Sequence, residues 1–150
     1  MPQSLSHVIV HLVFSTKDRQ PLLGPGVLAR MHAYLATVCR DMEAEAYRVG
    51  GVADHVHLLG TLPRTVTQAS FVEQIKKTSS KWVKEQDSNC RQFAWQRGYG
   101  VFSVSVSQMD EVIRYIEIQE EHHRHRSFQE EYRAMLRRHG IAFDERYLWD

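Results

Sequence analysis

Cysteines are scarce in this sequence and long apolar runs are absent, which excludes several classes of protein. Among the 150 residues there are two cysteines, Cys39 and Cys90, which lie far apart and outside any Cys-x-x-Cys pattern. They indicate neither a disulfide framework nor a cysteine zinc site. No run approaches the roughly 18 apolar residues of a membrane span. The first residues also lack the basic and apolar segments of an export signal, so we expect a cytoplasmic protein that enters no membrane.

An excess of charge of one sign is also lacking, because the formal net charge is +1. This value does not by itself indicate a nucleic-acid-binding protein, although basic residues can still gather locally. With 43% apolar residues, a chain of this length can bury a substantial core. We expect a single domain over residues 1–150, with a core at 5–122 and a charged helical extension at 123–150.

The apolar pattern predicts the order strand, helix, strand, strand, helix, strand. Residues 28–42 and 67–85 carry apolar side chains at spacings of three and four, which is typical of amphipathic helices. β-prone runs predict strands at 7–14, 44–49, 54–62 and 99–106. The glycines at 50–51 predict the turn between the second and third strands. This order is that of split βαβ folds, so we expect an α+β, ferredoxin-like (RRM-like) fold with an antiparallel sheet, helices on one face and a C-terminal tyrosine-bearing helix.

The segment Asp-His-Val-His at residues 54–57 could form part of a metal site. Alternate side chains of a strand share a face, so His55 and His57 point the same way, while Val56 and Leu58 point into the core. Two imidazoles on one face provide half of a metal site, which needs a further ligand. The motif is short, and the alternative is two surface histidines on a half-buried strand.

Other polar residues near this pair have open roles. Asp54 either orients a histidine from outside the ligand shell or only ends the turn. His7 and His11 share one face of the first predicted strand and are interpreted as structural or peripheral residues.

A later helix, predicted at 108–121, carries residues that would complete such a site. Tyr115 and Gln119 are four residues apart, so they lie one above the other on one flank of this helix. In one interpretation Tyr115 only packs and Gln119 is a polar residue at the edge of the helix. In the other, Tyr115 is a nucleophile and Gln119 is an amide ligand at the same place. The side of the helix that docks on the sheet is set by its apolar stripe: Met109, Val112, Ile113 and Ile116.

Together these residues are what metal-dependent phosphodiester cleavage requires. A divalent cation held by His55, His57 and Gln119 would polarise a phosphate oxygen. Tyr115 would then attack phosphorus and become linked to DNA. With imidazole and amide ligands alone, the site carries no negative charge of its own, and we expect Mg²⁺ or Mn²⁺. A phosphotyrosyl bond is similar in energy to a phosphodiester, so the step is reversible, as strand transfer requires.

Basic and aromatic residues elsewhere are candidate DNA contacts. The loop at 87–98 carries Arg97 and two aromatic residues, Phe93 and Trp95, which either anchor the loop or stack on an unpaired base. A lysine-bearing helix face is either solvated surface or a contact for backbone phosphate. Three lysines share the outer face of the second predicted helix: Lys77, Lys81 and Lys84.

The last part of the sequence predicts one more helix and an aromatic tail. Ser127 and Glu130 have the spacing of a capping box at the start of this helix. The tail at 147–149 (Tyr-Leu-Trp) is expected to dock on the body of the protein or on another subunit. One face of the helix is apolar or aromatic: Phe128, Tyr132, Met135 and Leu136.

Four segments in this order resemble the IS200/IS605-type (Y1) transposases, which are small members of the HUH (His-hydrophobe-His) nucleases. The likeness spans roughly residues 5–122. Its segments are His-Leu-Val-Phe-Ser-Thr-Lys at 11–17, Asp-His-Val-His-Leu-Leu at 54–59, Trp-Gln-Arg-Gly-Tyr at 95–99 and Tyr-Ile-Glu-Ile-Gln at 115–119.

The resemblance implies a ferredoxin-like fold and cut-and-rejoin transposition of single-stranded DNA that carries hairpins near the element ends. It implies Tyr115 as the nucleophile that forms a 5′-phosphotyrosine, and His55, His57 and Gln119 as metal ligands. It also implies a homodimer in which the tyrosine helix of one subunit can complete the metal site of the other.

Some alternatives remain beside this interpretation. His122, His123 and His125 follow closely behind Gln119, and a histidine can outcompete an amide as a ligand for softer metals. We interpret that cluster as a charged helix end. The alternatives to a transposase are a non-catalytic module that binds single-stranded nucleic acid, and a host-domesticated HUH relative that processes repeated extragenic palindromes.

Overall fold

A four-stranded antiparallel sheet forms the centre of the computed structural model, which describes residues 2–150. The strands lie in the order β2-β3-β1-β4, and the central strand β1 pairs with both β3 and β4. Every residue of β1 is buried, as predicted for a strand covered on both sides. This order confirms the predicted ferredoxin-like fold. The strand bounds are β1 (Ile9–Ser15), β2 (Ala46–Val52), β3 (His55–Thr61) and β4 (Gly100–Val104).

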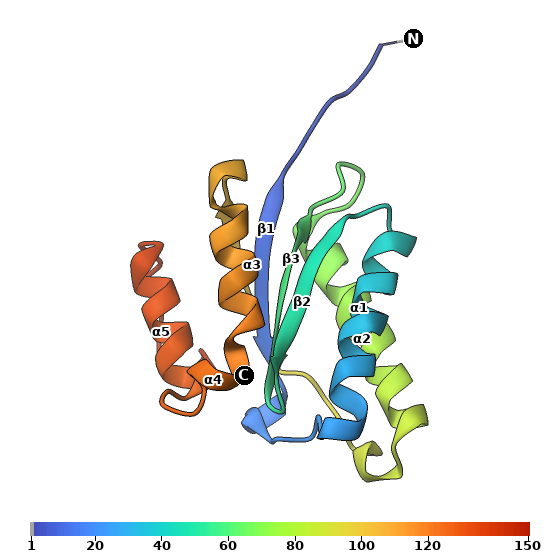
Figure 1. Cartoon of the computed structure of the whole chain (residues 1–150), viewed down its shortest axis with the longest axis vertical. Helices are drawn as coiled ribbons and strands as arrows, with labels where there is room; N and C mark the ends of the chain where they lie inside the picture. The colour runs from blue at the N-terminus through green and yellow to red at the C-terminus, as the bar shows by residue number, and fades with distance from the viewer. Residues whose placement is uncertain (1) are drawn as a thin grey trace.

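Helices cover both faces of this sheet (Figure 1). The helices α1 (Pro25–Asp41) and α2 (Gln68–Gln86) pack on one face. The helices α3 (Met109–Glu117), α4 (Gln119–His122) and α5 (Phe128–Arg138) lie over the other. No helix in residues 2–150 is long and apolar enough to cross a membrane.

Side chains that alternate along the strands divide the core between the two faces. Val56 and Leu58 on β3 join the large core beneath α1 and α2, as the alternation predicts. Leu59, on the other face of β3, packs with Ile9 and with Ile116 of α3. A third cluster joins the sheet to the predicted apolar face of α5. The sheet contributes Val13 and Phe102, and α5 contributes Phe128, Tyr132, Met135 and Leu136.

The C-terminal tail packs on the body of the same chain. The Trp149 ring lies 6.0 Å from the Tyr132 ring and 6.4 Å from the Phe128 ring, centroid to centroid. Gly98 donates a backbone hydrogen bond of 2.8 Å to the carbonyl of Asp150. The tail therefore holds α5 against the sheet.

The predicted turn at Gly50-Gly51 is wrong. Both glycines belong to β2 and pair with β3, and the turn falls at Ala53-Asp54. A Cβ atom on Gly50 would lie 2.6 Å from the Cγ2 atom of Ile116. Glycine at this position therefore serves the close approach of α3 to β2 rather than a turn.

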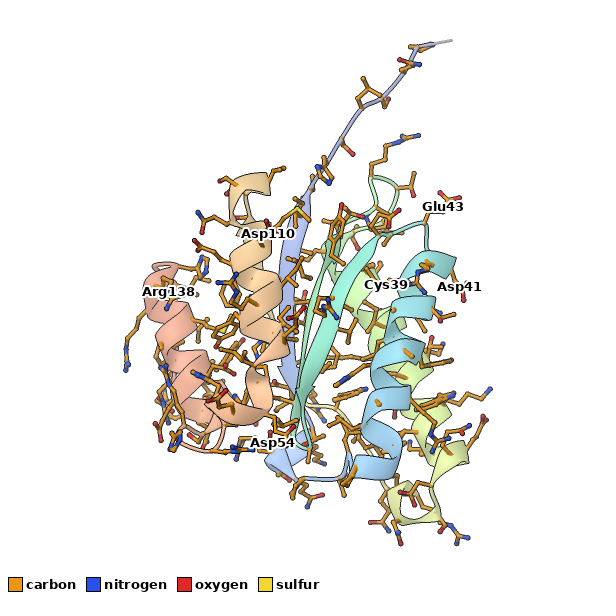
Figure 2. The ribbon with its side chains drawn as sticks, viewed as in Figure 1. Cys39, Asp41, Glu43, Asp54, Asp110 and Arg138 are labelled. Atoms are coloured by element: carbon orange, nitrogen blue, oxygen red, sulfur yellow. The ribbon has the colours of Figure 1, made fainter. Side chains whose placement is uncertain are left out.

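The predicted helix at 108–121 is interrupted. It ends as α3 at Glu117, and α4 begins at Gln119 after Ile118 leaves the regular helical conformation. Figure 2 shows Asp54 at one end of the sheet, and Asp110 of α3 and Arg138 of α5 toward the opposite end. The two long helices on this face thus run in opposite directions, and the end of α3 meets the start of α5 near Asp54.

Candidate active site

Two histidines on β3 lie at the base of the site. His55 and His57 are fully buried on the face covered by α3 and α5, and their ring centroids lie 5.1 Å apart. The prediction that they share one face is therefore confirmed. The alternative of two surface histidines is wrong.

One ring nitrogen of each histidine is held by a neighbour, and the other points into the site. The Nδ1 atom of His55 lies 2.7 Å from the Oδ1 atom of Asp54, so Asp54 orients this ring as well as belonging to the turn. The Nδ1 atom of His57 lies 2.8 Å from the Nε2 atom of His11. His11 is buried and bonds His57, so of its two predicted roles the structural one fits and the peripheral one does not, whereas His7 bonds the Tyr47 hydroxyl in an exposed position.

Tyr115 and Gln119 reach the same place from α3 and α4. The Tyr115 ring centroid lies 5.7 Å from that of His57, and the Gln119 Oε1 atom lies 3.1 Å from the Nε2 atom of His55. The amide nitrogen of Gln119 donates to the carbonyl of Tyr115 at 3.3 Å, which links the two residues across the helix break. All four site residues predicted from the sequence therefore meet within one chain.

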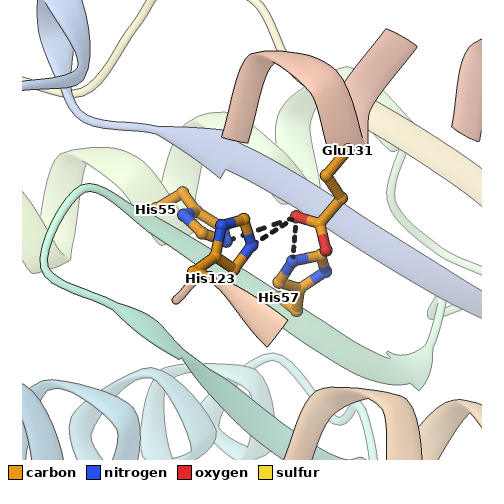
Figure 3. A group of neighbouring side chains, drawn as sticks. All are labelled: His55, His57, His123 and Glu131. Carbon is orange, nitrogen blue, oxygen red and sulfur yellow. Dashed lines mark hydrogen bonds and ion pairs between the residues drawn. The ribbon is translucent and has the colours of Figure 1, made fainter. Parts of the chain in front are cut away.

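Glu131 of α5 lies among these residues, although it was not among the residues predicted from the sequence. Its side chain is 1% exposed. Its Oε1 atom lies 3.1 Å from His57 Nε2 and 3.0 Å from His123 Nε2 (Figure 3). Its Oε2 atom accepts hydrogen bonds from the Tyr115 hydroxyl and from the Gln119 amide. The expectation of a site without negative charge is therefore wrong.

The position of Glu131 within α5 is the signal that could have revealed it. It follows Phe128 by three residues and precedes Met135 by four, so it lies on the apolar face of the helix. A carboxylate on such a face is seldom buried without partners. Its position therefore indicates a role in a site.

The histidines that follow Gln119 also enter the site. His123 contacts Glu131, and its ring centroid lies 4.4 Å from that of His55. The Nε2 atom of His122 lies 3.5 Å from the Glu131 carboxylate. His125 is exposed. The interpretation of the cluster as a charged helix end is therefore wrong for His122 and His123.

Burial and hydrogen bonding set the charges of the Glu131 carboxylate and its partners. Burial alone would raise the pKa of Glu131, but hydrogen bonds from His123, His55 and His57 outweigh it and hold this pKa well below its usual range. Burial alone would lower the pKa of His55, but hydrogen bonds to Asp54 and Glu131 raise it to about 9. Glu131 is therefore ionised at neutral pH and has a cationic neighbour.

The pKa of the Tyr115 hydroxyl is raised, whereas that of the Glu131 carboxyl is lowered. Burial raises the pKa of Tyr115, and the negative charge of Glu131 raises it further. Tyr115 therefore remains a neutral phenol at neutral pH in this arrangement. Activation of its oxygen requires a positive charge close to the site.

A groove between α3 and α5 leads to the tyrosine. It has a volume of about 550 Å³, and both Tyr115 and His11 line it. At its far wall the Phe102 ring stacks on His139, with 4.5 Å between centroids, and Arg138 borders it. An aromatic wall and a basic rim suit a nucleotide strand.

The candidate DNA-contacting lysines lie away from the tyrosine. Lys77, Lys81 and Lys84 are exposed on α2, which covers the opposite face of the sheet. Lys77 and Arg97 line one shallow pocket of about 270 Å³. The structure therefore brings Lys77 and Arg97 together, and it places the three lysines of α2 on the opposite face of the sheet from Tyr115.

The loop before β4 is an anchored part of the fold. Phe93 and Trp95 are buried, and Trp95 packs edge-on against Phe14. The ammonium of Lys76 donates to the carbonyls of Gln96 at 2.7 Å and Gly98 at 2.6 Å. These aromatic residues anchor the loop, so the alternative of base stacking does not apply to them.

Comparison with solved structures finds proteins of the same fold. A proposed transposase from Deinococcus radiodurans R1 is 22% identical, with a TM-score of 0.61 over 79% of this chain and 98% of that one. A REP-associated tyrosine transposase bound to a REP hairpin is 19% identical, with a TM-score of 0.58 over 82% of this chain and 72% of that one. A search of curated proteins finds no match.

Comparison with protein families gives a match over most of the chain. The family described as "Transposase IS200 like" matches residues 4–119, which include β1 to α3, both histidines of β3 and Tyr115. The helix α5 and its Glu131 lie beyond the matched residues. The chain therefore belongs to the IS200-like transposase family and is an enzyme of the transposase class.

Proposed function

We propose that this transposase cuts and rejoins single-stranded DNA, with Tyr115 as its nucleophile and His55, His57 and Gln119 at its metal centre. The observation that carries this proposal is the meeting of the tyrosine hydroxyl with both histidines around one buried carboxylate. A nucleophile and a cation-binding group within reach of one phosphate are the parts that phosphoryl transfer to tyrosine needs.

The reaction exchanges one phosphoester for another. The Tyr115 oxygen forms a bond to phosphorus, the bond from phosphorus to the 3′-oxygen breaks, and the phenol proton ends on the released 3′-hydroxyl. The products are a 5′-phosphotyrosine and a free 3′ end. Rejoining is the reverse step with a different 3′-hydroxyl, so it needs no energy source.

A divalent cation, Mg²⁺ or Mn²⁺, would supply a Lewis acid that offsets the negative charge developing on the phosphate oxygens. The residues present fit a divalent ion, because imidazole nitrogens and a carboxylate oxygen converge within 4.8 Å of one another, and the nitrogen ligands suit Mn²⁺ better than Mg²⁺. The hydrogen bond from Tyr115 to Glu131 orients the hydroxyl toward the same point.

The DNA partner is proposed to be an element end with a hairpin. The groove beside Tyr115 has room for the single strand that is cut. Lys77, Lys81, Lys84 and Arg97 would hold phosphates of the hairpin outside the site. The protein would act as a homodimer that brings two ends together, with each Tyr115 serving the histidines of its own chain.

A cleavage assay tests this proposal against the binding-module alternative. Single-stranded DNA that carries hairpin ends is incubated with the protein and Mg²⁺ or Mn²⁺, and the products are separated under denaturing conditions. Cleavage that stops on addition of a chelator, and in a His57→Asn variant that still binds DNA, supports the proposal. Binding without cleavage under every condition would identify a non-catalytic module.

A second candidate is the processing of repeated extragenic palindromes by a domesticated relative. It is favoured by the fold similarity to a REP-associated tyrosine transposase. The two candidates share the chemistry but differ in their DNA. Hairpin ends on either side of the gene would favour a mobile element, and palindromes scattered through the genome that are cut by this protein would favour the second candidate.

A further inference from the structure

Four side chains converge on a single point in the site, and two of them come from outside the predicted ligand set. His55, His57, His123 and Glu131 each present one ligand atom, and these atoms all lie within 4.8 Å of one another (Figure 3). The Glu131 Oε1 atom lies 3.4 Å from the Nε2 atom of His55, 3.1 Å from that of His57 and 3.0 Å from that of His123. A tetrahedral ion with bonds of about 2.0–2.2 Å places its ligand atoms about 3.3–3.6 Å apart. Small side-chain movements would therefore admit an ion.

Two of these histidines have their second ring nitrogen bonded to a neighbour, as metal-ligating histidines do. Asp54 holds His55 through Nδ1, and His11 holds His57 through Nδ1, so both Nε2 atoms face the same point. Ligating histidines in proteins almost always have their second nitrogen bonded in this way, often to a carboxylate. The ring orientations are thus set before any ion binds.

A divalent cation also suits the charge of the site. Glu131 is 1% exposed, and within residues 2–150 its ion pairs are with histidines and not with lysine or arginine. A buried carboxylate is costly unless a positive charge compensates it. A divalent ion between three imidazoles and this oxygen provides that charge.

Gln119 is placed to support Glu131 rather than to replace it. Its amide nitrogen donates to the Glu131 Oε2 atom at 3.1 Å and to the Tyr115 carbonyl at 3.3 Å. Its side chain is 1% exposed and lies between the tyrosine helix and α5. The Gln119 Oε1 atom lies 3.1 Å from the Nε2 atom of His55, whereas the Glu131 Oε1 atom lies within 3.4 Å of the Nε2 atoms of all three histidines.

We propose that the metal centre is a three-histidine, one-carboxylate site formed by His55, His57, His123 and Glu131, and that it selects a first-row transition ion such as Mn²⁺, Co²⁺ or Zn²⁺ over Mg²⁺. This inference rests on the proposed function in taking the same site, and it replaces Gln119 in the ligand set with His123 and Glu131. Imidazole-rich sites favour transition ions, whereas Mg²⁺ requires oxygen ligands in octahedral geometry. Two of the ligands lie beyond residues 4–119, so α5 becomes part of the catalytic centre.

Metal binding by the full-length chain tests this ligand set without any measurement of DNA cleavage. Metal-free protein is titrated with Co²⁺, Zn²⁺, Mn²⁺ and Mg²⁺ by calorimetry, and the Co²⁺ complex is also followed by visible absorption. We expect tighter binding of Co²⁺ and Zn²⁺ than of Mg²⁺, and the intense visible bands of four-coordinate Co²⁺. A weak six-coordinate spectrum from the wild-type protein would overturn the proposal without need of a variant.

Variants then separate the two possible ligand sets. Glu131→Gln and His123→Asn should each weaken Co²⁺ binding by at least about 100-fold, since loss even of an outer partner costs 10–100-fold. The matched controls Glu130→Gln and His125→Asn, on neighbouring exposed residues, should change nothing. Full affinity in both test variants, with loss in Gln119→Ala, would restore the smaller ligand set and leave the proposed function intact.

Failure of the proposed function has a different signature. If His55→Asn binds metal as tightly as the wild type, the ion does not bind at the histidine pair, and this outcome would overturn the proposed metal centre and this ligand set together. Circular dichroism of each variant checks its folding. His123 is only partly buried, so its variant remains informative if Glu131→Gln unfolds.

Discussion

The hydroxyl of Tyr115 on α3 donates a hydrogen bond to the carboxylate of Glu131 on α5, which lies outside the segment matched by the transposase family. The same carboxylate contacts three histidine side chains through its other oxygen. One residue of the C-terminal helix therefore connects the nucleophile to the metal-binding group.

Each subunit is expected to use its own tyrosine, because Tyr115 already lies beside His57 of the same chain. Tyr115→Phe and His57→Asn variants are mixed, allowed to exchange subunits and assayed for covalent DNA adduct. The mixture should form no more adduct than either variant alone, since every chain lacks one part of its site. Restored adduct formation in the mixture would show that the tyrosine acts across the dimer.

The lysine face of α2 is expected to bind DNA backbone. Changing Lys77, Lys81 and Lys84 together to glutamine should weaken binding about equally for unrelated sequences. The slope of log affinity against log salt should fall by up to about 3, since each lost phosphate contact removes about 0.7–0.9. The control Arg40→Gln removes a charge from an exposed site on α1. An unchanged slope in the triple variant would make this face ordinary solvated surface.

Gly50 is expected to be essential for the packing of α3. A Cβ atom there would lie 2.6 Å from the side chain and 2.9 Å from the carbonyl oxygen of Ile116. Gly50→Ala should therefore lower the free energy of unfolding by about 1–3 kcal/mol, the usual cost of overpacking. Urea denaturation measures this change. Gly26→Ala, where a Cβ meets nothing within 4 Å, should be neutral or slightly stabilising, and equal losses in both variants would argue against a steric cause.

Protonation of His32 is expected to lower stability in acid. Burial lowers its pKa from 6.5 to about 4, and its Nε2 atom has no hydrogen-bond partner within the part of the chain described. The unfolded chain therefore takes up the proton first, so stability is present above pH 6.5 and is lost as the pH falls toward 4. The loss amounts to at most about 3 kcal/mol.

This acid effect is measured by comparing variants at several pH values. Urea denaturation of His32→Gln should show a smaller loss between pH 7 and pH 4 than the wild type does. The exposed His125→Gln serves as the control and should follow the wild type. Parallel curves for His32→Gln and the wild type would mean that His32 does not contribute.

Local patterns were sufficient to predict the strands, the long helices and half of the site. Alternation along β3 places His55 and His57 on one face, and the helical spacing of Tyr115 and Gln119 places them on one flank. Both predictions depend only on the geometry of a single element. The family resemblance then related the two elements to each other.

The remainder of the site depends on contacts between elements that no local pattern encodes. Glu131 and His123 reach the histidines only because α5 folds back over the sheet. Gly50 and Gly51 were predicted as a turn because glycine permits both tight turns and close packing, and the sequence does not distinguish them. At Gly50 the packing of Ile116 against β2 decides in favour of the second role.

The proposed chemistry depends on a covalent bond between Tyr115 and DNA, and direct detection of this bond is the most decisive measurement. The protein is incubated with Mn²⁺ and single-stranded DNA that ends in hairpins. The adduct is then isolated under denaturing conditions, digested and analysed by mass spectrometry. We predict a 5′-phosphate linked to Tyr115, which is lost in Tyr115→Phe and retained in the control Tyr47→Phe. An adduct on another residue, or one that persists in Tyr115→Phe, would contradict the account.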